Sequence, residues 1–187
     1  MAVTKLDPKT ALVVIDLQKG IMALPTAHPT DKVVKLARQM IDAFRRHHLP
    51  IVLVNAAGIA PGRTDSPSPK LEDFPPDWTD LVPELNRQPE DHAVTKRTWG
   101  AFTNTGLDGH LKKLGVTQVV IIGVATSIGV ESTARQAHEN GFHVTLAVDA
   151  MTDMNADAHT NSITRIFPRL GETGTTQQII DLLNARA

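Results

Sequence analysis

Two charged side chains and one glycine-containing turn follow apolar runs, at the places where parallel α/β proteins carry their chemistry. Asp16 follows the apolar run 11–15, Lys96 ends a β-prone run, and the segment 123–134 (GVATSIGVESTA) has Gly129 at its tip. A carboxylic acid can donate a proton, an ammonium group can bind an anion, and the free N–H groups at a helix start can hold an oxyanion. The plain alternative is a helix cap, a solvated lysine and an ordinary turn.

Short apolar runs alternate with helical patterns along the whole chain. Strands are expected over residues 11–15, 51–54, a run ending near Lys96, 118–122, 143–148 with Asp149 at its end, and weakly near Glu172. Helices are expected from a Thr30 cap to a stop before Pro50, and over 80–87, 103–115, 130–140, 156–167 and around 179–183.

The order of these elements predicts the fold class. Strands that alternate with helices, without hairpin signals, indicate a three-layer, Rossmann-like α/β fold. We expect a mainly parallel sheet of about six strands with helices on both faces, in one domain over 1–187. The segment 56–80 is rich in Pro, Gly, Ser and Asp, and loops of this length are usually lids, binding loops or interface elements.

The composition limits which binding partners and which cellular location can be expected. The 187 residues include 19 Lys plus Arg against 20 Asp plus Glu, which leaves no charge excess for nucleic acid or an anionic membrane. There is no cysteine, so disulfides, thiolate metal sites and a cysteine nucleophile are excluded. No run has the length of a membrane span, and the first residues lack a signal-peptide pattern. We expect a cytoplasmic protein whose partner is a small-molecule substrate.

Three ordered motifs resemble those of one enzyme superfamily. VVIDLQ, TKRTWGAF with TGLDGHLKKLG, and GVATSIGVESTARQAHENGF are similar to the motifs of the isochorismatase-like hydrolases. This superfamily includes isochorismatases, nicotinamidases and N-carbamoylsarcosine amidohydrolase, and the resemblance extends from about Lys5 to Leu183. It implies a hydrolase that works as a homo-oligomer, a dimer or a tetramer.

The resemblance also implies roles for individual residues. Asp16 matches the catalytic aspartate, Lys96 the catalytic lysine, and Gly129 the position of the nucleophilic cysteine in the amidases. A cis peptide bond between Val124 and Ala125 is implied as well, with the backbone N–H groups of Ala125 and Gly129 forming an oxyanion hole.

Further substrate contacts are expected around this centre. By the resemblance, Gln18 of the first motif and Thr126 of the turn lie near the substrate. Trp99 is expected to line a pocket or to pack in the core or an interface. Arg63 is expected to bind an anionic group or to be solvated.

The sequence departs from the amidases where the chemistry matters most. Glycine cannot form an acyl intermediate, and the nearby hydroxyls of Thr126, Ser127 and Ser132 are poor nucleophiles without a base. Isochorismatases also resemble this chain in having glycine at the position of Gly129, and they hydrolyse a vinyl ether by protonation from the aspartic acid. They have an aromatic residue where this chain has Ala125, so isochorismate itself is not the expected substrate.

The leading interpretation is hydrolysis of a small carboxylated enol ether or related metabolite by Asp16, without a covalent intermediate. One alternative is a catalytically silent metabolite-binding or interaction protein derived from a cysteine amidase. Another is an amidohydrolase that uses water or a serine on a C–N bond. No cofactor and no metal are expected, because the chain has no His between His48 and His92 to match the metal ligands of nicotinamidases.

Overall fold

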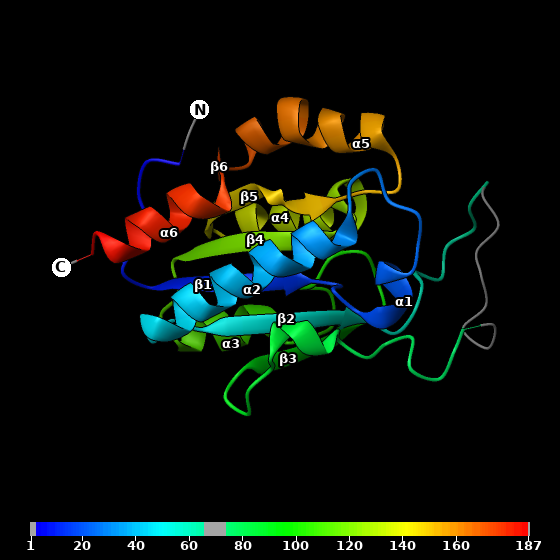
Figure 1. Cartoon of the computed structure of the whole chain (residues 1–187), viewed down its shortest axis with the longest axis horizontal. Helices are drawn as coiled ribbons and strands as arrows, with labels where there is room; N and C mark the ends of the chain where they lie inside the picture. Colours follow the sequence, from blue (N-terminus) through cyan, green and yellow to red (C-terminus); the bar gives the residue numbers. More distant parts are fainter. Residues whose placement is uncertain (1–2, 66–73, 187) are drawn as a thin grey trace.

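The computed structural model describes residues 3–65 and 74–186 and contains one parallel sheet (Figure 1). Six strands pair in the order β3-β2-β1-β4-β5-β6, and every pairing is parallel. The strands are β1 (Thr10–Ile15), β2 (Ile51–Ala56), β3 (His92–Lys96), β4 (Gln118–Val124), β5 (His143–Thr152) and β6 (Glu172–Gly174).

Helices and single turns connect the strands. The α-helices are α1 (Lys19–Met22), α2 (Thr30–Arg46), α3 (Leu107–Lys113), α4 (Glu131–Glu139), α5 (Ala156–Asn161) and α6 (Thr176–Asn184). Short 3₁₀ turns form η2 (Pro83–Leu85) and η5 (Phe167–Arg169), and π turns form η3 (Thr126–Val130) and η4 (Ser162–Ile166).

Two apolar cores lie on opposite faces of the sheet. Successive side chains of a strand point to opposite faces, so Leu12 and Val14 join the core under α2 and α6, while Val13 and Ile15 join the core under α3 and α4. In Figure 1, α2 and α6 cross the near face and α3 and α4 lie behind the strands. The expected three-layer α/β fold is confirmed.

The strand order has its switch point at β1. Chain connections run outward from β1 in both directions, to β2 and β3 on one side and to β4, β5 and β6 on the other. In open parallel sheets, ligands bind at such a switch point, beyond the carboxyl ends of the strands. Asp16, Lys96 and η3 all lie at this edge, because they follow or end β1, β3 and β4.

Three expected helix boundaries are wrong. The helix expected over 80–87 is only the three-residue η2, because Leu81 pairs with Gln18 in an antiparallel bridge and Asn86 turns into the left-handed region. The helix expected over 103–115 begins at Leu107, after Gly106 with φ +74°. Thr30 is the first helical residue of α2 rather than its cap.

Strand β5 is longer than expected, and Asp149 does not end it. The register between β4 and β5 shifts near residues 121–123, after which Met151 pairs with Gly123 and Thr152 with Val124. The strand therefore continues to Thr152, and Asp153 follows it. Asp149 instead accepts hydrogen bonds from the backbone N and the hydroxyl of Thr176, at the start of α6.

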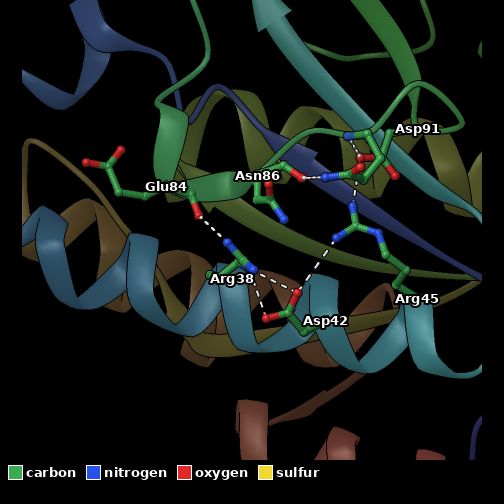
Figure 2. Close-up of polar contacts among 7 residues, drawn as sticks. Arg38, Asp42, Arg45, Glu84, Asn86 and Asp91 are labelled. Atoms are coloured by element: carbon green, nitrogen blue, oxygen red, sulfur yellow. Dashed lines mark hydrogen bonds and ion pairs between the residues drawn. The ribbon is translucent and has the colours of Figure 1, made fainter.

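A polar network fixes the segment before β3 to α2 (Figure 2). Arg38 donates from Nε to Asp42 and from Nη1 to the carbonyl of Glu84. Arg45 Nη2 donates to Asp91 Oδ2 at 2.9 Å, and the Asp91 side chain is only 2% exposed. This network holds the approach to β3, and with it the strand that carries Lys96.

Over residues 3–65 and 74–186, no helix has both the length and the apolar character needed to cross a membrane.

Candidate active site

A buried pair of an acid and a lysine lies at the edge of the sheet where the parallel strands end. Asp16 Oδ2 lies 2.7 Å from Lys96 Nζ, and both residues are buried. Lys96 Nζ also donates to the carbonyl of Thr98 at 3.3 Å. Two residues that are 80 positions apart in the sequence thus form one ion pair, because β1 and β3 end at the same edge.

The backbone of Asp16 departs from strand geometry at this point. Its φ is +52°, in the left-handed region that Asp adopts more readily than most residues. Its backbone N still donates to Val54 O at 3.0 Å, so the residue stays attached to β2 while the chain turns out of β1. This turn marks the end of β1 and the start of the site.

Burial raises the pKa of the Asp16 carboxyl from its ordinary value of 3.8 to about 6, and the adjacent Lys96 ammonium opposes this rise. Desolvation disfavours the charged form of a carboxyl group, whereas a neighbouring cation favours it. The effect of burial on the pKa of Asp16 is therefore larger than the opposing effect of Lys96. Asp16 Oδ1 is buried and has no hydrogen-bond partner in the described part of the chain, so this oxygen is free for a proton or a ligand.

Gly129 lies directly against this pair. A Cβ atom at Gly129 would be 3.0 Å from Ile15 Cγ2 and 3.2 Å from Asp16 Oδ2. The Val124–Ala125 peptide bond just before η3 is cis. A side chain at position 129 would begin within contact distance of the Asp16 carboxylate, so the glycine determines what chemistry this turn can supply.

Two neighbouring segments hold η3 in place. Asp153, buried after β5, accepts from the backbone N of Ser127 at 2.7 Å and from its hydroxyl at 2.8 Å. The buried hydroxyl of Thr133 donates to Gly129 O at 2.7 Å and accepts from Ala101 N at 3.1 Å. The turn is thus tied both to the end of β5 and to the segment that follows Lys96.

The turn hydroxyls nearest to Gly129 are occupied. Thr126 is fully buried, and its Oγ1 lies 3.0 Å from Thr152 O and 2.8 Å from His159 Nδ1. Ser127 Oγ is bonded to the Asp153 carboxylate. Both hydroxyls fix the turn, and this geometry disfavours either as the substitute nucleophile.

Gln18 has no side-chain hydrogen free for a substrate. Its Nε2 donates to Ala56 O at 3.1 Å and to Trp78 O at 3.0 Å, and its Oε1 accepts from Ala56 N at 2.7 Å. Both amide hydrogens are used, so Gln18 joins the end of β2 to the segment around Trp78.

Trp99 and Arg63 lie at the surface. Trp99 is 57% exposed, which removes it from the apolar cores. Arg63 is exposed, and in the described part of the chain its guanidinium makes no hydrogen bond or ion pair with Asp16 or Lys96. The structure therefore brings together Asp16, Lys96 and Gly129, and leaves Trp99 and Arg63 outside the buried pair.

Sequence reasoning missed Asp153, Thr133 and His159. Asp153 had a usable signal, because residues 150–152 can continue the strand past Asp149 and Asp153 comes directly after them. Thr133 and His159 had none, since a helical threonine and a lone histidine look the same whether or not they reach a turn. No group of three or more metal-ligating side chains is found among residues 3–65 and 74–186.

The buried pair of Asp16 and Lys96 at the edge of the parallel sheet forms a candidate active site, and comparison with known proteins gives the family of the chain. A family model described as "Isochorismatase domain" matches residues 10–178, and the chain belongs to this family of hydrolases.

Three similar proteins support this assignment. The uncharacterized isochorismatase family protein YwoC of Bacillus subtilis is 41% identical over 180 residues, covering 92% of this chain and 93% of YwoC. Nicotinamidase 3 of Arabidopsis thaliana is 30% identical over 172 residues, covering 83% and 80%. The structure of an isochorismatase family protein from Burkholderia thailandensis has a TM-score of 0.93 and 40% identity, covering 98% of this chain and 100% of that one.

Proposed function

We propose that this hydrolase cleaves a small carboxylated enol ether or a related metabolite by acid catalysis from Asp16, without a covalent enzyme intermediate. The observation that carries the proposal is the buried Asp16 carboxyl, whose pKa is about 6 and whose Oδ1 has no partner in the described structure. A general acid works best when its pKa lies near the working pH.

The proposed reaction uses one proton and one water. Protonated Asp16 transfers its proton to the terminal carbon of the enol ether, and the ether oxygen stabilises the resulting oxocarbenium ion. Water adds to the carbon that bears the ether oxygen, which gives a hemiketal, and returns a proton to the Asp16 carboxylate. The hemiketal then collapses to an alcohol and a keto acid, which leaves the enzyme unchanged.

Lys96 couples substrate binding to the protonation of Asp16. A substrate carboxylate that draws the Lys96 ammonium toward itself weakens the attraction between Lys96 and Asp16. Because that attraction is what lowers the pKa of Asp16, the bound substrate raises this pKa and favours the acid form. The N–H groups of Ala125 and Gly129 hold a substrate oxygen in this scheme.

The absence of a cysteine supports this route over the covalent route of a cysteine amidase. The chain contains no cysteine, and Thr126 and Ser127 are committed to His159 and Asp153. A route that needs only a proton donor and water remains open to the residues present. The relative Nicotinamidase 3 is named for an amidase activity, so the test of this proposal includes amides beside enol ethers.

The test is a paired substrate screen with carboxylated vinyl ethers in one set and small amides, including nicotinamide, in the other. Wild type is expected to turn over a vinyl ether, and Asp16→Asn is expected to lose about 100-fold or more in rate, the usual effect of a general acid. Turnover by a folded Asp16→Asn variant at the wild-type rate would contradict the role of Asp16. Binding of a screened compound without turnover by wild type would favour a silent binding protein.

A further inference from the structure

A small cavity lies outside the Asp16–Lys96 pair, between the start of α2, the middle of β5 and α5. Its volume is about 200 Å³, and its polar walls are formed by His28, Lys32, Asp149 and His159. Pockets for drug-sized ligands measure roughly 300–1,000 Å³, so this cavity suits a smaller guest.

The hydrogen bonds around His159 indicate which of its ring nitrogens carries a hydrogen. The single hydroxyl hydrogen of Thr126 is directed at Thr152 O, 3.0 Å away, so His159 Nδ1 is the donor in its 2.8 Å contact with Thr126. In neutral His159, Nε2 is then the acceptor, and in the protonated ring it is a second donor. His159 is only 9% exposed and lines the cavity, so Nε2 is the ring nitrogen that can bind a ligand there.

The same reasoning assigns His28. Thr152 Oγ1 accepts from the backbone N of His28 at 3.1 Å, so its own hydrogen is free to point at His28 Nδ1, also 3.1 Å away. This leaves the ring hydrogen of neutral His28 on Nε2. The centroids of the His28 and His159 rings are 4.7 Å apart, and the two rings therefore present adjacent donors once His159 is protonated.

Hydrogen-bond donors in the cavity wall suit an anion, although nearby carboxylates oppose it. Lys32 carries a positive charge, and the first turn of the 17-residue helix α2 adds the positive end of its dipole, whereas Asp31 in the same turn carries a negative charge. Asp149 in the wall keeps its negative charge, which a bound anion must be held against, and its Oδ1 accepts two hydrogen bonds from Thr176. Asp153, which faces His159 from the end of β5, is likewise occupied by Ser127 and Asn155.

We propose that this cavity binds a small oxyanion, held by Lys32, His28 and His159. A ligand at His159 contacts the residue that is bonded to Thr126 of η3, so it sits one hydrogen bond away from the turn of the candidate active site.

The proposal predicts a definite pH dependence. Burial, and then the neighbouring His28, lower the pKa of His159, while Asp153 opposes this shift. A bound anion favours the protonated ring, so binding strengthens as pH falls and protonated His159 becomes accessible. Sulfate is the suitable probe, because it keeps its double charge across this range.

The test is a sulfate titration of the full chain at constant ionic strength, with chloride as the balancing salt, followed by the NMR signals of the His28 and His159 rings. Wild type is expected to bind saturably, and more tightly at about pH 5.5 than at about pH 8. Lys32→Gln is expected to weaken binding at least about threefold, as removal of one partly solvated charge does. Lys35→Gln, which makes the same change one turn away on α2 and outside this cavity, is expected to have no effect.

The absence of saturable sulfate binding would overturn the proposal, and so would any of the next three results. Chemical shifts that follow ionic strength alone would show an adventitious ion only. Equal weakening by Lys32→Gln and Lys35→Gln would show general charge attraction rather than a site. His159→Gln tests the ring directly: it keeps a side-chain donor to Thr126, so a folded variant that binds sulfate with the wild-type pH dependence would remove His159 from the site. The same titration with acetate distinguishes a carboxylate guest from a tetrahedral oxyanion.

Discussion

At the scale of single residues, the site depends on a carboxyl group whose burial outweighs its partner cation. Asp16 is buried beside Lys96 at 2.7 Å, yet its pKa lies near 6 rather than below 3.8. Although Asp16 is paired with a lysine, its carboxyl group still takes up a proton as the pH falls to about 6. This is the property that a proton donor at neutral pH requires.

Lys96→Met tests this electrostatic balance through stability. In wild type the folded state holds the Asp16 proton more tightly than the unfolded chain between pH 3.8 and about 6, so the contribution of Asp16 to stability falls as pH rises through that window. Removing the cation raises the pKa of Asp16 further and widens the window. We expect a loss of about 3 kcal/mol in the free energy of unfolding at pH 8, and little loss at pH 5.

Urea unfolding at the two pH values measures this difference, and the double variant Asp16→Asn/Lys96→Met is the control. Without either charge, the control is expected to lose the pH dependence that comes from this pair. An equal loss for Lys96→Met at pH 5 and pH 8 would show that Lys96 stabilises the fold by packing rather than by its charge.

Gly129→Ala tests how closely the turn approaches the pair. The added methyl group would lie 3.0 Å from Ile15 Cγ2 and 3.2 Å from Asp16 Oδ2, so these neighbours must shift. We expect a loss of about 1 kcal/mol in the free energy of unfolding, at the low end for overpacking. Gly109→Ala is the matched control, because it lies within α3 with open space around it and is expected to gain up to about 1 kcal/mol. A neutral Gly129→Ala would mean that the turn has more room than the structure gives it.

At the scale of elements, the contacts that position Lys96 begin well before β3. The segment 83–91 has little regular structure of its own, and α2 holds it through the network of Figure 2. Arg45 reaches the nearly buried Asp91, whereas Arg38 reaches the half-exposed Asp42. The two arginines lie seven residues apart on one helix and differ chiefly in the burial of their partners.

This difference predicts unequal effects for Arg45→Leu and Arg38→Leu. Without Arg45, the buried Asp91 carboxylate keeps only the hydrogen bond from the backbone N of Gln88 among the contacts that the structure describes. We therefore expect a loss of about 2 kcal/mol in the free energy of unfolding. Loss of Arg38 removes a solvated pair and is expected to cost under about 1 kcal/mol. Urea unfolding followed by circular dichroism compares the two, and a larger effect for Arg38 would contradict this order.

At the scale of the whole molecule, local patterns were enough to predict the sheet. The positions of β1, β2 and β4 followed from apolar runs such as Ile51–Val54, β3 followed from a β-prone run that ends at Lys96, and β6 was expected only weakly near Glu172. Gly115 and Gly141 ended helices as expected because both lie at positive φ. The sixth, β5, was recognised but cut short at Asp149. Its extension depends on a register shift against β4, which a single sequence does not display.

The candidate site was predictable only in part, for the same reason. Asp16, Lys96 and Gly129 follow strand ends, so their meeting at one edge could be predicted from topology. Whether burial or Lys96 sets the pKa of Asp16 depends on three-dimensional packing. The link from Thr133 to Ala101 is a long-range contact that no local pattern encodes.

The claim that Asp16 is the catalytic acid is tested most directly by the pH dependence of turnover. The substrate for this measurement is the vinyl ether that wild type hydrolyses in the paired screen. If protonated Asp16 is the acid, kcat/KM is expected to fall about tenfold per pH unit above the pKa of about 6, and Asp16→Asn is expected to remove that activity. A rate that stays constant from pH 5 to about 8, or that rises as Asp16 ionises, would contradict acid catalysis by this residue.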